Sequence, residues 1–157
     1  MTDTIDRMLR AVASWTCACA LAGCDGGPAT VVLRTDDPKV LETGAAVYRT
    51  HCAACHGASL EGQQRWRERD AQGRMPAPPH DASGHTWHHP DQLLFDITKH
   101  GVAKAAKLKD YDSAMPAFAG VLSDAEIVAV LAWIKSQWPP EVRRHQDEVN
   151  GAARRSR

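Results

Sequence analysis

The segment Cys52-Ala53-Ala54-Cys55-His56 constrains this chain more than any other feature of its sequence. Its pattern, C-x-x-C-H, is typical of the covalent attachment of a c-type haem. Two thiols three positions apart in a helical turn lie on one face, where they can form thioethers with the two vinyl groups of one porphyrin. The histidine that follows can offer an imidazole nitrogen to the iron. The motif therefore predicts a domain folded around one covalent haem c, held by Cys52, Cys55 and His56.

A C-x-x-C pair has two other common uses. As half of a zinc site it would need two more ligands at a similar spacing, and the sequence contains no second C-x-x-C. As a dithiol redox pair it would follow a strand in a βαβ unit, whereas the residues before Cys52 have a helical pattern. Both uses are less consistent with this sequence than haem attachment.

Length and composition favour one soluble domain with tails. The chain has 157 residues, of which 43% are apolar and 24% charged, and its formal net charge is zero. This balance gives no reason to expect nucleic acid as a partner. Only nine residues are aromatic, the sum of five Trp, two Tyr and two Phe, so a haem would add much of the flat apolar surface that the core otherwise lacks.

The first 23 residues are expected to be a cleaved export signal. Arg7 and Arg10 precede a short apolar run, which ends in Leu21-Ala22-Gly23-Cys24. This ending resembles a bacterial lipoprotein cleavage box, and cleavage there would leave Cys24 as a lipidated first residue. An ordinary cleaved signal remains the alternative. We expect export to the periplasmic side, with a lipid anchor on a membrane and a tether over residues 24–36.

Helical patterns flank the motif and recur later in the chain. Asp37-Pro38 is a helix start, with Asp as the N-cap and Pro in the first turn. The helix that this start predicts runs into Cys52 and contains Gly44, which costs about 1 kcal/mol relative to alanine unless another element packs closely there. A second helix is expected after Pro90, ending at Gly101. Residues 57–90 and 102–122 are predicted loops, long enough to need a haem to wrap around.

The last clear helix begins with a capping box, Ser123-Asp124-Ala125-Glu126, and ends before Pro139-Pro140. The charged residues 141–157 predict a short helix followed by a disordered basic tail. The haem domain is therefore expected to span residues 37–140.

These features together resemble the class I monohaem cytochromes c over roughly residues 38–138. The resemblance rests on the helix that leads into C-x-x-C-H, a Met-Pro pair in a late loop, and a final amphipathic helix that carries an aromatic residue. It implies an all-α cytochrome c fold, with three to four helices and long loops wrapped around one covalent haem. In that family the first and last helices cross, and the resemblance gives Gly44, Tyr48 and Trp133 places at the crossing.

The resemblance also implies a sixth ligand to the iron, for which Met115 is our prediction. Met115 lies on the loop before the last helix, and Pro116 biases it towards an extended conformation. Met75 is also followed by proline, but it is expected on the loop along the His56 side, where a backbone carbonyl could accept the Nδ1 proton of His56. Tyr111 and Trp87 are further candidates for the haem pocket.

Five histidines are alternative ligands, either for a bis-histidine haem or for a second metal. They are His80, His85, His88, His89 and His100. Clustered histidines are more often polar surface or pocket lining, and we interpret them in that way.

The sequence thus predicts one-electron transfer without a small-molecule substrate or a catalytic residue. A redox protein donor and a redox protein acceptor are the expected partners. Lys99, Lys104, Lys107 and Lys109 could guide an acidic partner or could be ordinary solvated lysines. Two alternatives remain open, a small haem protein with a free sixth position and an accessory subunit of a larger oxidase or dehydrogenase.

Overall fold

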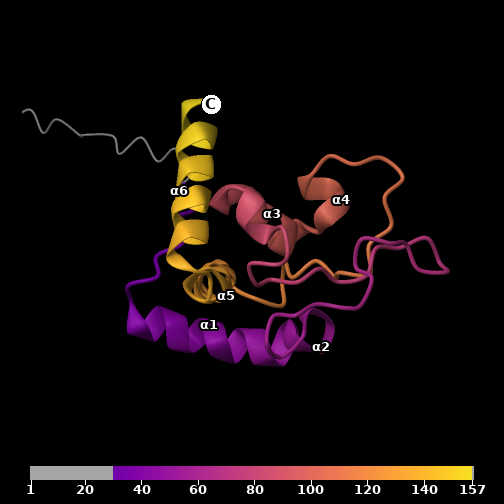
Figure 1. Ribbon diagram of the computed structural model, residues 1–157, viewed down its shortest axis with the longest axis horizontal. Coiled ribbons are helices and arrows are strands. Elements are labelled where there is room, and N and C mark those ends of the chain that lie inside the picture. Colours follow the sequence, from indigo (N-terminus) through magenta and orange to yellow (C-terminus); the bar gives the residue numbers. More distant parts are fainter. Residues whose placement is uncertain (1–29, 157) are drawn as a thin grey trace, which may run out of the picture.

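The computed structural model describes residues 30–156, and this part of the chain consists of helices joined by long loops (Figure 1). The predicted signal, Cys24 and most of the tether lie outside the described residues. Only an isolated bridge between Ala119 and Leu122 has β character within residues 30–156. The predicted all-α class is therefore confirmed. None of the described helices has the length and apolar character that a membrane span requires.

The haem motif lies where two helices meet. Helix α1, Pro38–His51, begins as predicted, since the Asp37 carboxylate accepts hydrogen bonds from the backbone N–H groups of Lys39 and Val40. Helix α2, Ala53–His56, follows after Cys52, which ends α1 and begins α2. The backbone N–H of His56 donates to the Cys52 carbonyl at 2.9 Å. The motif therefore forms one helical turn, as the spacing of its cysteines requires.

Helix α5, Asp124–Ser136, packs directly against α1. Ser123 and Glu126 form the predicted capping box at its start. In Figure 1, α1 lies across the view while α5 is seen end-on beside it. A Cβ on Gly44 would lie 2.1 Å from the backbone oxygen of Ala129, so only glycine allows this approach. The rings of Tyr48 and Trp133 meet with their centroids 4.7 Å apart, which confirms the predicted crossing.

Three smaller elements lie between the C-x-x-C-H motif and α5 in the sequence. They are the 3₁₀ helix η1 (Thr86–His88), α3 (Asp91–His100) and α4 (Val102–Ala105). Gly101 ends α3 as predicted, with a φ of 87°. The loop that carries Met115 is fixed to the end of α3, because the N–H groups of Phe118 and Ala119 donate to the carbonyls of Thr98 and Lys99 at 3.0 and 2.9 Å.

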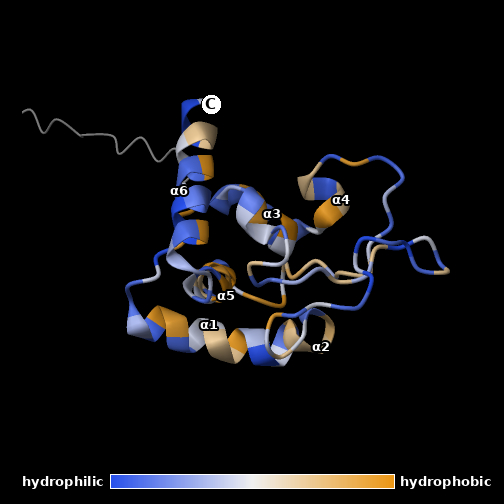
Figure 2. Cartoon of the chain, viewed as in Figure 1, coloured by the Kyte–Doolittle hydropathy of each residue, from blue (hydrophilic) through white to orange (hydrophobic). Residues whose placement is uncertain are grey.

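The C-terminal segment differs from the prediction. Instead of a short helix and a disordered tail, residues Pro140–Arg155 form a sixteen-residue helix, α6. Figure 2 shows that α6 is mostly hydrophilic, whereas α5 is largely hydrophobic. A helix of such composition cannot be held by apolar burial alone. Two of its side chains are buried polar groups, Gln146 and Asn150, and they lie one turn apart.

These two side chains bind Asp91, the first residue of α3. Gln146 Nε2 and Asn150 Nδ2 donate to Asp91 Oδ1 at 2.6 and 3.0 Å, and the backbone N–H of Asp91 donates to Asn150 Oδ1 at 2.8 Å. The other oxygen, Asp91 Oδ2, accepts from the backbone N–H of Leu33 at 3.0 Å. Asp91 thus joins α6 and the start of the described chain to α3 through a buried, mutually satisfied polar network.

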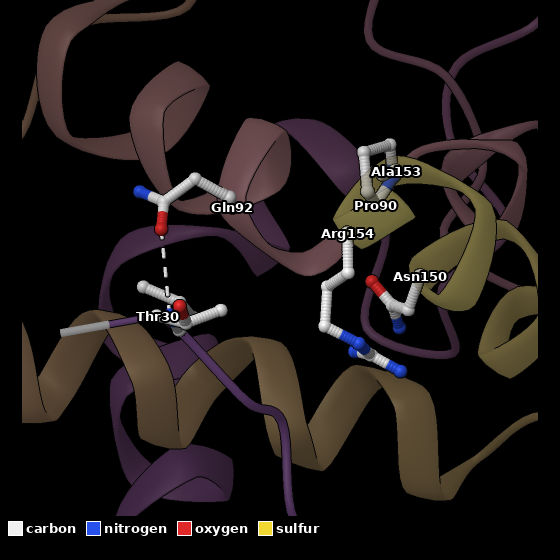
Figure 3. Close-up of a pocket in the computed structure, with 7 residues that line it drawn as sticks. Thr30, Pro90, Gln92, Asn150, Ala153 and Arg154 are labelled. Carbon is white, nitrogen blue, oxygen red and sulfur yellow. Dashed lines mark hydrogen bonds between the residues drawn. The ribbon is translucent and has the colours of Figure 1, made fainter. Parts of the chain in front are cut away.

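Figure 3 shows the outer edge of this polar network. Gln92 reaches the described N-terminal segment, where its Oε1 accepts from the backbone N–H of Val31 at 3.4 Å. Thr30 lies in the same small pocket as Ala153 and Arg154 of α6. The segment that leads into α1 is therefore held between α3 and the C-terminal helix.

We expect Gly44→Ala to lower the free energy of unfolding, because the added methyl group would overlap the Ala129 carbonyl and the Trp133 Cβ. Overpacking of this kind costs about 1–3 kcal/mol, which exceeds the helix propensity that alanine gains. Thermal and denaturant unfolding of the full chain would measure it. Gly151→Ala in α6 is the control, since its nearest neighbour is the flexible end of Arg155 at 3.4 Å; this variant should be as stable as the parent or more so. Equal stability of Gly44→Ala and the parent would contradict the close packing.

We expect Asp91→Ala to destabilise the fold by about 3 kcal/mol, because it leaves buried donors of Leu33, Gln146 and Asn150 without their acceptor. Denaturant unfolding gives the free energy, and hydrogen exchange shows whether α6 opens first. Asp96→Ala, on the same helix, is the control. Among the described side chains, the Asp96 carboxylate accepts a hydrogen bond only from Gln92 Nε2. This substitution should cost less than about 1 kcal/mol. Similar losses in both variants would argue against the network.

Candidate functional site

A cavity of about 700 Å³ lies between the haem motif, α3, α5 and the two long loops. This volume is within the range of cofactor sites. Its apolar wall comes from the inner faces of α3 and α5 and includes Leu94, Ile97, Val130, Leu131 and Ile134. The C-x-x-C-H motif faces this wall from the end of α1 and from α2. The fold therefore places a large, mostly apolar cavity beside the residues that the sequence assigns to haem.

The four predicted haem residues, Cys52, Cys55, His56 and Met115, all line this cavity. Cys52 is half-buried and Cys55 is exposed, and both are free thiols. Burial, with a smaller contribution from Cys55, raises the pKa of the Cys52 thiol to about 11. A thiol with a raised pKa stays protonated near neutral pH. Across residues 30–156, no group of three or more His, Cys, Asp or Glu side chains is arranged to hold a metal ion.

His56 is held in the orientation that a metal ligand needs. Its side chain is buried, and Nδ1 lies 2.8 Å from the carbonyl oxygen of Pro78. A carbonyl only accepts, so Nδ1 carries the proton and Nε2 keeps a lone pair free for a metal. Burial lowers the pKa of His56, an effect that the Pro78 carbonyl partly opposes, and the neutral form is favoured. The Pro-rich loop therefore supplies the predicted carbonyl.

The loop around Pro78 is itself firmly held. The backbone N–H of His80 donates to the Leu60 carbonyl at 2.8 Å, and the His80 carbonyl accepts from Trp138 Nε1 at 2.7 Å. Gly84 packs against Pro79 so closely that a Cβ would lie 2.0 Å from the Pro79 carbonyl oxygen. The glycines and prolines of this loop thus build a fixed support for His56 instead of a mobile connection.

Tyr48 fixes the other side of the motif. Its hydroxyl donates to the Gly57 carbonyl at 2.9 Å and lies 3.4 Å from the His56 carbonyl. The side chain is almost fully buried, and this burial raises the pKa of the Tyr48 hydroxyl above its usual range. One residue thus packs against Trp133 at the helix crossing and holds the end of α2.

Both candidate methionines reach the cavity. Met115 is partly buried and packs against the core, and its backbone N–H lies 3.2 Å from Ser113 Oγ. Met75 also lines the cavity. It precedes Pro78 by three residues, so it belongs to the loop that supports His56. The backbone thus places Met75 on the loop that supports His56 and Met115 on a separate loop fixed to α3.

The histidines divide between the cavity and the outer surface. His80, His85 and His89 line the cavity, whereas His88 and His100 do not. Burial holds the pKa of His80 well below its usual range. The ring of His80 stacks on that of His56, a contact that no local sequence pattern predicted.

Two aromatic assignments from the sequence have different outcomes. Tyr111 lines the cavity as predicted. Trp87 does not: its ring stacks on His88 with centroids 3.7 Å apart, and its Nε1 donates to the Ala82 carbonyl at 3.3 Å. Trp66 lines the cavity in its place and stacks on His85. Nothing in the local sequence distinguished Trp66, because it lies in an irregular loop without periodicity.

The fold and the site define a cytochrome c-type haem domain. The family model described as cytochrome C oxidase, cbb3-type, subunit III matches residues 39–134 of the chain, which therefore belongs to this family. The matched region begins in α1 and ends in α5, so it contains the whole haem motif and Met115. Neither the curated proteins nor the solved structures that were searched contain a match.

Proposed function

We propose that the chain carries single electrons through one haem c, attached to Cys52 and Cys55 and bound axially by His56 and Met115. Membership of the family supports haem-based electron transfer in general. The ligation is our proposal, and it rests chiefly on one observation, that these four side chains line a single cavity of about 700 Å³. When bound, a haem supplies an iron that can take up and release one electron.

The chemistry of the lining residues suits such a group. The cavity is walled by aliphatic side chains of α3 and α5, and the thiol, imidazole and thioether groups of the motif and of Met115 face it. Cys52 and Cys55 would hold the group at two points. The aliphatic wall would exclude water, which helps to set the reduction potential.

His56 and Met115 would have different effects on the haem iron. The Pro78 carbonyl keeps the proton on Nδ1 of His56 and holds the ring, so that Nε2 can bind without rearrangement. A thioether is a soft ligand and raises the potential relative to a second histidine. If His56 and Met115 both bind the iron, they would leave it no open position for a substrate. This arrangement supports electron transfer and not catalysis at the iron.

The family description points to an oxidase as the redox partner. Because the family is described as an oxidase subunit, we propose that a terminal oxidase accepts the electron, either from a freely diffusing domain or within a stable complex. Of the four lysines near the Met115 loop, Lys99 is paired with Asp124 at 2.7 Å, while Lys104, Lys107 and Lys109 are exposed. The three exposed lysines would attract an acidic partner surface.

We further propose that the protein is exported and anchored through Cys24. The arrangement of the described residues is compatible with an anchor. Residues 30–33 are held beside α6, and the long loops of the cavity lie on the opposite side of the molecule (Figure 1). An anchor attached before residue 30 would leave the cavity side available to redox partners.

Mass spectrometry of the mature protein, made in a host that attaches haem c, tests the cofactor and the anchor together. We expect a mass that includes one haem and the acyl chains on Cys24. Replacing Cys52 and Cys55 with Ser should remove the haem alone, because no thioether can form. Cys24→Ser should remove the acyl chains and keep the haem. Unmodified Cys52 and Cys55 thiols in the parent protein would refute the proposed cofactor attachment.

Absorption spectroscopy of the ferric protein tests the sixth ligand. We expect the weak long-wavelength band of a sulfur–iron bond, and we expect Met115→Ala to abolish it and to lower the reduction potential. Met75→Ala is the matched control, since Met75 lines the same cavity but belongs to the loop that supports His56. It should keep the band. The opposite pattern would make Met75 the ligand. A five-coordinate parent that binds carbon monoxide would instead favour the alternative with an open sixth position.

A further inference from the structure

The ring of His80 lies face to face with the ring of His56. Their centroids are 3.9 Å apart and their planes differ by 19°. Tyr48 meets His80 edge-on, with centroids 6.1 Å apart and planes at 61°. His56 is therefore the outer member of a layer of three rings.

His80 is fixed from both directions along its backbone. Its N–H donates to Leu60 and its carbonyl accepts from Trp138 Nε1, at 2.8 and 2.7 Å. It also follows Pro78 by only two residues. One short, immobilised segment thus provides both the carbonyl that binds His56 Nδ1 and the ring that stacks on His56.

The side chain of His80 is not explained by the polar contacts of the fold. Its Nδ1 is buried, and the residues that the structure describes offer it no hydrogen-bond partner. An unsatisfied buried nitrogen lowers stability, so hydrogen bonding gives no reason for this side chain. His80 also lines the haem cavity. What the side chain does contribute is a flat surface parallel to the imidazole of His56.

We propose that His80 is a positioning residue that fixes the plane of the His56 imidazole within the cavity. The hydrogen bond to Pro78 holds His56 at one atom and still allows its ring to rock about that contact. A parallel ring at stacking distance removes this freedom. The proposal rests on the proposed role of His56 as an axial ligand. The plane of an axial imidazole influences the electronic asymmetry of the iron, so His80 would act on the redox centre through His56.

Three variants of the full-length, haem-loaded protein test the proposal. His80→Leu fills much of the same space without a flat ring, His80→Phe keeps a flat ring without nitrogens, and His145→Leu removes an exposed histidine of α6 that does not line the cavity. The measurements are ferric electron paramagnetic resonance, proton shifts of the haem methyl groups and the midpoint potential. Circular dichroism would confirm that each variant is folded.

We expect His80→Leu to broaden or split the ferric resonance and to change the spread of the haem methyl shifts, because His56 would adopt more than one plane. The potential should shift with them. His80→Phe should restore one narrow species, and His145→Leu should match the parent. The proposal is overturned if His80→Leu gives the parent spectra, or if a folded His80→Phe departs from them as far as His80→Leu does.

The parent protein provides a test that needs no variant. In its reduced, diamagnetic form, nuclear Overhauser contacts between the ring protons of His56 and His80 are expected at the stacking distance. If they are absent from a haem-loaded parent that has its sulfur–iron band, the proposal for His80 fails and the proposed function stands. If haem is not attached, or His56 does not bind the iron, the proposed function fails and the role of His80 fails with it.

Discussion

The close approach of α1 and α5 at Gly44 is the constraint on which the rest of this structure depends. Helix α1 leads into the haem motif, and α5 supplies the aliphatic wall that faces it. The two helices can bring these parts to opposite sides of one cavity only because no side chain separates Gly44 from the Ala129 backbone. Tyr48 then joins the crossing to the site, since it packs on Trp133 and holds the end of α2.

The ring of His56 is held by the loop around Pro78, and not directly by the helix crossing. Its important contacts use backbone atoms: the carbonyl of Pro78 for His56, and the N–H and carbonyl of His80 for Leu60 and Trp138. Backbone groups of a fixed loop cannot turn away as side chains can. A long loop without secondary structure can therefore still hold the His56 ring in one position through a hydrogen bond.

Local patterns in the sequence predicted the elements whose causes are local. The caps at Asp37 and Ser123 and the end of α3 at Gly101 follow from neighbouring residues, and all are confirmed. The close packing at Gly44 is a long-range contact that the family resemblance implied, and it is confirmed as well. The length of α6 could not be predicted, because its buried side chains bind Asp91, which is 55 and 59 positions away in the sequence. The stacking of His80 on His56 was missed for the same reason, as was the choice of Trp66 over Trp87 for the cavity.

Helix α6 does not line the cavity, whereas α3 and α5 do. The family model ends at residue 134, before α6 begins at Pro140. Through Asp91, α6 is instead joined to Leu33 and to the start of α3, on the side away from the cavity loops. A pull on the chain before residue 30 would thus reach the polar network at Asp91 before it reached α1 and the haem motif. For a protein anchored through that end, this attachment would protect the geometry of His56 from forces on the tether.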